Sequence, residues 1–213
     1  MVEGKDIFTI GVSSLSLIIS MASLYLSNFR RPKTSAEIGP FIHIYYHPPD
    51  QTGFYLPVVF HNNSPTKAIV YKAFLEIIDT NGRHFALRWL TSNSIDKEMN
   101  YTETGAAAPF KMDGYEAKSD VLQFAWHNHP DLENLEFVEG SYEVTLYVWT
   151  ANRTKPNISI TERFDISKEL AEIMHEKRST GDNTTRYFPL AGKGLISFCS
   201  GKTPVNFDGL PVR

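Results

Sequence analysis

Only one cysteine, Cys199, is present among the 213 residues, so the chain forms no intrachain disulfide. Small secreted domains often depend on disulfides, whereas a domain of this size does not need them. The cysteine count therefore slightly favours a reducing compartment. Phe198 and Ser200 flank Cys199 and supply neither a base nor a cation, so we expect a structural thiol and not a nucleophile.

A marked excess of charge is also missing. The formal net charge is −3, whereas a nucleic-acid-binding domain concentrates Lys and Arg on one face, so we expect no nucleic-acid partner. The sequence contains no Gly-x-Ser-x-Gly elbow, no phosphate-binding glycine loop and no plausible Cys/His pair. We therefore predict no enzyme activity, no catalytic residues and no cofactor, while an active site assembled from scattered residues stays open.

Charged residues are absent from Ile7 to Leu26, which is the longest such apolar stretch. As a helix, these residues span about 30 Å, the thickness of a bilayer's hydrocarbon core. Tyr25 lies where aromatic side chains favour the membrane boundary, and Pro32 stops the helix from continuing. Residues 1–33 are therefore predicted to form a single-pass membrane anchor whose first partner is the lipid bilayer.

The charges that flank this stretch predict its orientation. Arg30, Arg31 and Lys33 follow it, and basic residues favour the cytoplasmic side. We therefore expect the folded domain in the cytoplasm. The alternative is an uncleaved signal anchor with a periplasmic or lumenal domain, and five Asn-x-Ser/Thr patterns keep that alternative open, at Asn62, Asn100, Asn152, Asn157 and Asn183.

Hydroxyl side chains recur along the apolar stretch at alternating spacings of four and three, which places them on one side of a helix. Small residues let helix backbones approach closely, and hydroxyls can hydrogen-bond across the contact. We expect this stripe to mediate self-association or docking on a partner helix; alternatively, each hydroxyl bonds to its own preceding turn. The stripe consists of Thr9, Ser13, Ser16, Ser20, Ser23 and Ser27.

Residues 38–166 alternate apolar and polar side chains between turn signals, which is typical of β-strands. A hydrophobic content of 42% is enough for a core. Asn81-Gly82 predicts a tight hairpin turn, and Thr91 to Lys118 is expected to be irregular. We predict about seven strands, over residues 41–46, 54–60, 68–79, 85–89, 119–126, 140–149 and 158–166. This pattern indicates an all-β fold, an antiparallel β-sandwich.

The stretch Gly140 to Leu146, with the pattern Gly-x-Tyr-x-Val-x-Leu, resembles the penultimate strand of immunoglobulin-like and fibronectin-type domains. The resemblance covers residues 38–166 in strand pattern only. It implies an immunoglobulin-like sandwich in which Tyr142 forms the tyrosine corner. The cysteine pair and tryptophan spacing of true immunoglobulin domains are absent, and a shared fold does not imply a shared function.

The C-terminal part is expected to hold one short helix and an irregular tail. Ser167 can cap a helix over residues 167–178, and Gly181 can end it. The tail covers residues 179–213 and contains two apolar clusters, Tyr187–Leu190 and Leu195–Phe198. Such clusters can fasten an extended tail to the domain, and a segment ordered only by a partner looks the same.

Histidines offer the only arguable metal site. His127 and His129 are two residues apart and His43 and His47 four apart, and two ligands two apart on a strand share one face. Because His127 and His129 lie in a turn-like segment, we favour surface or hydrogen-bonded histidines and predict no metal site.

Aromatic residues of the predicted irregular stretch are the expected partner contacts, namely Tyr101, Phe110 and Tyr115. The sequence as a whole predicts a membrane-tethered β-sandwich that acts as an interaction module, an accessory or scaffold subunit of a membrane-associated complex. The alternative is an extracytoplasmic ligand- or metal-binding sensor or enzyme on the same anchor.

Overall fold

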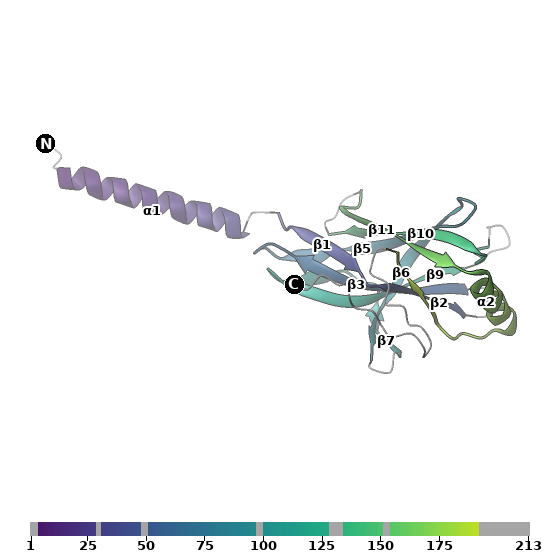
Figure 1. Ribbon diagram of the computed structural model, residues 1–213. Helices are drawn as coiled ribbons and strands as arrows, with labels where there is room; N and C mark the ends of the chain where they lie inside the picture. The colour runs from purple at the N-terminus through teal and green to yellow at the C-terminus, as the bar shows by residue number, and fades with distance from the viewer. Residues whose placement is uncertain are drawn as a thin grey trace, which may run out of the picture.

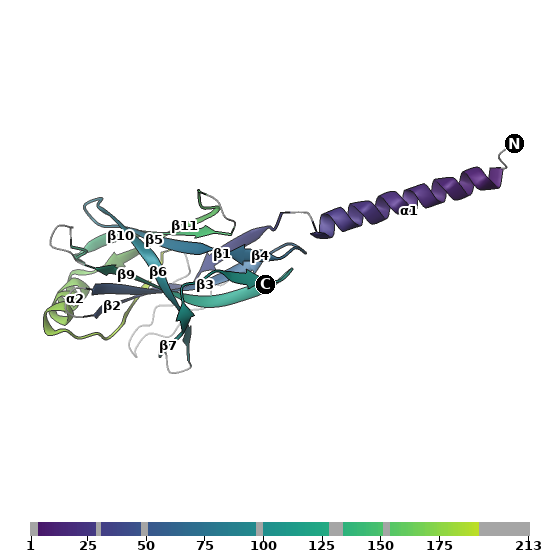
Figure 2. The ribbon, with the colours of Figure 1, turned by 180° about the vertical axis from the view of Figure 1, so that it is seen from behind.

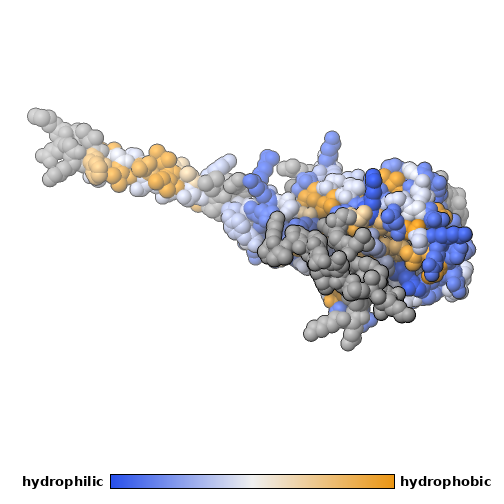
Figure 3. All heavy atoms as spheres, viewed as in Figure 1, coloured by the Kyte–Doolittle hydropathy of each residue, from blue (hydrophilic) through white to orange (hydrophobic). Residues whose placement is uncertain are grey.

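The computed structural model describes residues 4–28, 31–47, 51–96, 100–127, 134–150 and 154–191. A long N-terminal helix, α1 (Gly4–Asn28), projects away from a β-domain, as Figures 1 and 2 show from opposite sides. The side chains of residues 8–25 are all exposed, and apolar residues dominate this part of α1 in Figure 3. Phe8–Tyr25 is long and apolar enough to cross a membrane, a property shared with signal sequences.

The described part of the β-domain contains twelve strands and one helix. One sheet has the order β11-β10-β5-β6-β9-β3-β2-β12, with β1 on β3 and β7 on β6, and β4 pairs with β8 separately. All pairs are antiparallel. The strands are β1 (Thr34–Ile38), β2 (Phe41–His47), β3 (Gln51–Asn62), β4 (Ala68–Val70), β5 (Lys72–Ile78), β6 (His84–Ile95), β7 (Tyr101–Ala106), β8 (Phe110–Met112), β9 (Ala117–His127), β10 (Gly140–Trp149), β11 (Ile158–Ile166) and β12 (Arg186–Pro189).

The sheet curls until its two ends nearly meet around one core. Ala191 N donates to Arg163 O over 2.6 Å, which connects the chain after β12 to β11. Phe188 of β12 and Phe164 of β11 are both buried, with ring centroids 5.7 Å apart. Alternate residues of β3 and β5 face this core, as in Phe54, Leu56, Val58 and Phe60 of β3. The mostly-β prediction is therefore confirmed, and the sheet is barrel-like.

The expected separation into two sheets is not observed, because β6 belongs to both halves. Its first part pairs with β5, whereas its second part pairs with β9 and β7. Register shifts between Trp89 and Thr91 and between Ser92 and Asn93 allow this change of partner, since bulges bend a strand. The prediction of an irregular stretch over residues 91–118 is wrong, because β7 and β8 lie within it.

Two local features that the sequence predicts, the β5–β6 turn and the tyrosine corner, are present in the structure. Gly82 adopts φ 76° in the β5–β6 turn, where Gly82 N donates to Asp79 O and Asp79 N donates to Arg83 O, so the glycine takes the left-handed position of a bulged hairpin. Tyr142 is fully buried, and its hydroxyl accepts from Val138 N over 2.8 Å and donates to Val138 O over 3.1 Å. These bonds to backbone four residues upstream are those of a tyrosine corner. The immunoglobulin-like sheet arrangement itself is not confirmed.

The predicted short helix is α2 (Lys168–Thr180). Ser167 caps its first turn by accepting from Leu170 N, and Gly181 ends it with φ 72°. The tail then forms β12, which pairs with β2 at one end of the sheet. The Tyr187–Leu190 cluster therefore attaches the tail to the domain as expected, and it does so as part of a strand. The second cluster, Leu195–Phe198, and Cys199 lie outside the described residues.

Candidate functional site

Two surface hollows lie in the half of the domain that is farther from α1. The strand β3 runs from the far end of the domain to the end near α1. Its last residue, Asn62, pairs with Thr34 close to the anchor, and its first residue, Gln51, lies at the opposite end. Gln51 lines one hollow, and α2 lines the other. Figures 1 and 2 place α2 at the end of the domain opposite α1.

The first hollow has a volume of about 860 Å³, and we call it the tyrosine-lined hollow. Strands β2, β3, β7, β9 and β12 contribute to it, together with the segment that joins α2 to β12. Its lining mixes aromatic, amide and hydroxyl groups, which suits recognition of a polar partner surface or ligand. It is lined by Tyr45, His47, Gln51, Tyr55, Asn100, Tyr101, Gln123, Asn183, Thr184, Thr185 and Tyr187.

Three tyrosines stack along one wall of this hollow. The rings of Tyr45 and Tyr55 are 4.9 Å apart, and those of Tyr55 and Tyr101 are 4.0 Å apart and nearly parallel. Gln123 donates to the Tyr45 hydroxyl, and its own oxygen accepts from Thr91. Burial raises the pKa of Tyr55 to about 12, so this ring stays neutral at physiological pH. The wall is therefore a rigid, uncharged aromatic surface.

Beneath the stack lies His43, whose side chain is almost fully buried. Its ring makes edge contacts with Tyr101 and Tyr187, at centroid distances of 5.4 Å and 4.3 Å. Burial lowers the pKa of His43 to about 4, so the imidazole is neutral near pH 7. Within the described residues, His43 Nδ1 and the Tyr101 hydroxyl are buried without a hydrogen-bond partner. Such groups are rare in folded proteins and often mark functional sites.

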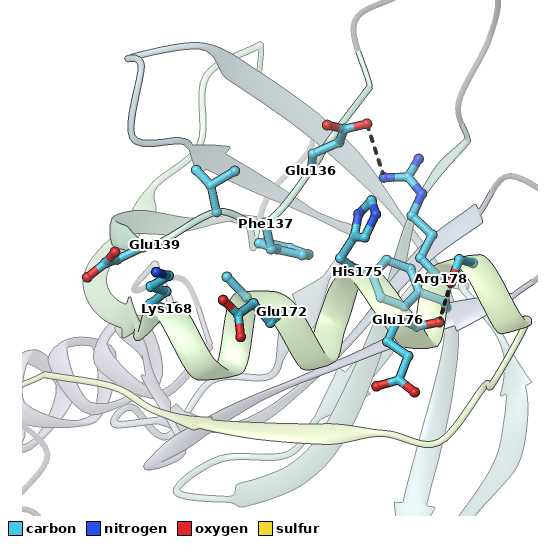
Figure 4. A pocket seen from close by; sticks show the side chains of 12 residues that line it. Glu136, Phe137, Glu139, Lys168, Glu172, His175, Glu176 and Arg178 are labelled. Carbon is cyan, nitrogen blue, oxygen red and sulfur yellow. Dashed lines mark hydrogen bonds and ion pairs between the residues drawn. The ribbon is translucent and has the colours of Figure 1, made fainter.

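The second hollow, the helix-edge groove, runs between α2 and the chain that precedes β10, with a volume of about 800 Å³ (Figure 4). Phe137 is buried at its floor. Arg178 of α2 donates to Leu135 O over 3.2 Å and lies 3.9 Å from Glu136, so it holds the two walls together. The groove is lined by Tyr46, Glu136, Phe137, Val138, Glu139, Lys168, Ala171, Glu172, His175, Glu176, Arg178 and Ser179.

Charged side chains form the rim of this groove. Glu172, His175 and Glu176 are exposed on α2 and point into solvent-accessible space in Figure 4. The groove thus combines an apolar floor with a charged rim, a combination that is common in protein interfaces.

The predicted metal candidates lie only partly within the described residues. His127 is exposed at the end of β9, and His129 lies outside the described residues. His43 is buried, whereas His47 is exposed. Gln51 of β3 pairs with His47 on one side and with His127 on the other, so it separates these two histidines. No group of three or more His, Cys, Asp or Glu side chains that could hold a metal ion occurs in the described part of the chain.

The three predicted contact aromatics lie in different surroundings. Tyr101 belongs to the stacked wall of the tyrosine-lined hollow, on β7 and not in a loop. Phe110, on β8, packs against the core beside Phe60. Tyr115 alone is strongly exposed, at 73%, and it lies at the end of the domain near α1. The hydroxyl stripe from Thr9 to Ser23 lies on exposed side chains of α1, and Ser27 belongs to the same helix.

Sequence reasoning missed most of the tyrosine-lined hollow. Tyr45, Tyr55 and Gln123 are far apart along the chain and carry no spacing signal. Lys177 was also missed: it is buried and donates to Asp182 and to Thr184 Oγ1, the latter over 2.8 Å, which fixes the chain after α2 beside the hollow. Only the burial pattern of the folded domain reveals these residues.

Comparison with known proteins identifies no family. No protein-family model and no curated protein sequence matches the chain. Among solved structures, the chain resembles a family 123 glycoside hydrolase from Clostridium perfringens, described as acting in glycolipid glycan hydrolysis. The identity is 11% and the TM-score 0.29, and the match covers 62% of this chain and 26% of the hydrolase. The chain therefore spans about a quarter of that protein, and the likeness carries no argument about activity.

Proposed function

We propose that the chain is a membrane-tethered interaction module, an accessory or scaffold subunit that presents its β-domain to a partner protein at the bilayer. The observation that carries the proposal is α1, where eighteen consecutive residues form an apolar helix with none of its surface buried against the domain. Exposed apolar surface of that extent is unfavourable in water and suits the hydrocarbon core of a bilayer.

The arrangement of the hollows supports the interaction role. Both lie in the half of the domain farther from α1, where a partner can reach them without meeting the bilayer. Interfaces commonly combine aromatic anchors with a polar rim. The tyrosine-lined hollow offers the exposed ring of Tyr187 as such an anchor, next to Tyr101.

Membrane fractionation of the full chain tests the anchor. Wild-type protein should stay in the membrane pellet after alkaline carbonate extraction. Replacing Leu17 and Ile18 by Lys should release the chain into the supernatant, because charges at the centre of a span are costly. Equal retention of the two forms would contradict a spanning role for α1.

Co-purification from mild detergent tests the partner. We expect a stoichiometric protein to accompany the wild-type chain and to be lost on Tyr187→Ser, which removes an exposed ring of the tyrosine-lined hollow. The matched control is Tyr115→Ser, because Tyr115 is an exposed ring at the opposite end of the domain. Loss of the partner with both variants, or with neither, would reject the tyrosine-lined hollow as the contact.

The basic residues behind α1 support a cytoplasmic domain, as the sequence predicts. One of the five glycosylation patterns also fits that side better: Asn62 is buried, and its amide donates to Thr66 O and Asp113 O, so it is unavailable as a glycan acceptor. Asn152 lies outside the described residues. A C-terminal reporter enzyme that is active only in an exported compartment would reverse this assignment.

A relation to immunoglobulin-like domains remains part of the proposal. The hydroxyl of Tyr142 makes the bonds of a tyrosine corner, which supports the relation, whereas the continuous barrel-like sheet differs from two separate layers. An experimental structure with β6 divided between two sheets would favour the relation.

A second candidate function is the binding of a small polar ligand in the tyrosine-lined hollow. Tyr101 lines the hollow and its hydroxyl is buried without a hydrogen-bond partner among the described residues, which favours this candidate, since a ligand could satisfy such a group. A thermal-shift screen of polar metabolites and sugars tests this candidate. A ligand that stabilises the wild type and fails to stabilise Tyr101→Phe would support it, and stabilisation of both forms would count against this site.

A further inference from the structure

The end of the β-domain nearest α1 is fixed close to the helix by both sequence and contacts. Thr34, the first residue of β1, follows the last residue of α1 by six positions, so the two are at most about 20 Å apart. Asn63 N donates to Lys33 O over 2.7 Å. The hydroxyls of Thr34 and Thr150 are 2.8 Å apart. The turn after β3 and the end of β10 therefore face the same side as the anchor.

This end of the domain is rich in cationic side chains. In the segments 31–34, 62–72, 111–116 and 154–157, which meet here, six cations accompany two carboxylates, Asp113 and Glu116. Asp113 forms an ion pair with Lys111 over 2.9 Å, and Glu116 accepts from Asp113 N. Both carboxylates are thus engaged within the loop. The cations, all exposed, are Arg31, Lys33, Lys67, Lys72, Lys111 and Lys155.

Aromatic and aliphatic side chains are interspersed among these cations. Tyr115 is 73% exposed and has a left-handed backbone, with φ 58°. Its N–H donates to Ser64 O, and Gly114 lies so close to Pro65 that an added Cβ would approach Pro65 O within 2.3 Å. The loop therefore holds an outward-facing tyrosine at a position that is sterically unfavourable for one.

Two further groups continue the same surface. Lys72 Nζ lies 4.4 Å from the centre of the Trp149 ring, and Ile69 and Tyr71 are each 37% exposed. Tyrosine, tryptophan and long basic side chains are the residues that occupy the headgroup region of a bilayer. We call this surface the basic end.

The opposite end of the domain has a different charge. The helix α2 and the chain before β10 expose five carboxylates there, while Lys168, Lys177 and Arg178 of α2 offset part of this charge, so the balance of these residues is −2. The carboxylates are Glu136, Glu139, Glu169, Glu172 and Glu176. The net charge of the whole chain is only −3, so the positive character of the basic end reflects segregation of charge along the domain and not an overall excess. An anionic surface at the base of the anchor would attract one end and repel the other.

We propose that the basic end docks on the headgroups of an anionic membrane leaflet, so that the β-domain stands on the bilayer in a fixed orientation. This inference rests on the proposed membrane anchor. Basic residues next to a span are attracted to acidic lipids over about one Debye length. The short connection to α1 keeps the basic end within that range. Tyr115 enters the headgroup region, and the acidic end with its two hollows points away from the membrane.

The test uses the full chain in lipid nanodiscs. A fluorophore is attached at Tyr115→Cys in a Cys199→Ser background, and its quenching by nitroxide-labelled headgroups is measured. Discs of phosphatidylcholine are compared with discs that also contain phosphatidylserine. The control label is at Glu139→Cys, an exposed position at the acidic end. The charge variant combines Lys67→Gln, Lys72→Gln and Lys111→Gln, and its folding is checked by thermal unfolding.

We expect strong quenching at position 115 in the phosphatidylserine discs and little at position 139. Quenching at 115 should fall in phosphatidylcholine discs and in about 1 M salt, where the Debye length is about 3 Å. Removing three cations should lower the ratio of docked to undocked domain by about 100-fold. Equal quenching in both kinds of disc, or in a folded charge variant, would overturn the docking. Protein that fails to elute with discs would overturn the anchor as well, so the two failures are distinguishable.

Discussion

The buried His43 makes the stability of the domain depend on pH. In the folded state its pKa is lowered by burial from 6.5 to about 4, whereas in the unfolded chain the ring is solvated and has its ordinary pKa. Between about pH 4 and pH 6.5, His43 is therefore protonated in the unfolded state and neutral in the folded state. The free energy of unfolding is therefore largest above about pH 6.5 and decreases as the pH falls towards 4.

The size of this decrease follows from the two pKa values. A difference of one in pKa corresponds to about 1.4 kcal/mol. For His43, the free energy of unfolding should be lower by about 2 kcal/mol at pH 5 and by about 3 kcal/mol at pH 4, relative to pH 7. A loss of that size is a large fraction of the stability of a typical domain.

Replacing His43 by Phe isolates this contribution. Phe keeps an aromatic ring against Tyr101 and Tyr187 and removes the proton-binding nitrogen. Urea unfolding of the full chain in detergent, followed by tryptophan fluorescence from pH 7 to pH 4, gives the free energy for both forms. Other carboxyl groups titrate in both, so the difference between the two curves reports His43. We expect the variant to lose about 3 kcal/mol less than the wild type over this range.

Two results would refute the reasoning. Parallel curves for wild type and His43→Phe would show that the folded ring binds protons as readily as the unfolded one. An NMR titration that places the His43 ring near its ordinary pKa would show the same directly. Either result would mean that the folded domain does not exclude solvent from the His43 ring.

Three further predictions concern the anchor and the fold. Replacing Ser16 and Ser20 by Leu should weaken helix association in a membrane two-hybrid assay, and an unchanged signal would show that the hydroxyl stripe is incidental. Tyr142→Phe should lower the free energy of unfolding by about 1–2 kcal/mol, because two hydrogen bonds are lost while the ring packing stays; an unchanged urea midpoint would contradict this. For Asp79, burial alone would raise the pKa, but hydrogen bonds from the Arg83 backbone and side chain and from the Asn81 backbone outweigh it and lower the pKa. Its contribution is complete above the ordinary pKa of 3.8 and is lost as the pH falls through the lower folded value. Asp79→Asn should therefore remove that part of the acid sensitivity in a urea titration that is extended below pH 3.8.

Local signals in the sequence predicted much of the fold correctly. Alternation located the long strands, Asn-Gly located the β5–β6 turn, and Ser167 and Gly181 located the ends of α2. These features depend on a few neighbouring residues, which is why a single sequence reveals them. The tyrosine corner followed from one strand pattern for the same reason.

Features that depend on distant residues were not predictable in this way. The strand β7 (Tyr101–Ala106) has no clear alternation, and it forms because β6 offers it an edge. The strand β12 is ordered by β2, which is about 140 positions earlier in the chain. The tyrosine-lined hollow joins residues from five strands, so no spacing indicates it. For α1, by contrast, the absence of charge was sufficient to predict an apolar helix long enough to cross a bilayer, because that property depends on composition more than on partners.

The length of β3 sets the height at which the domain can be reached. Its twelve residues run from the end near the anchor to the end near the hollows, which corresponds to about 40 Å at the usual rise of a strand. In the docked orientation, a partner must therefore extend about that far from the headgroups before it touches Tyr187 or α2. Membrane proteins with only short loops outside the bilayer could share the membrane with this chain and still fail to reach its hollows. The β-domain would thus select partners by their height above the bilayer as well as by their surface chemistry.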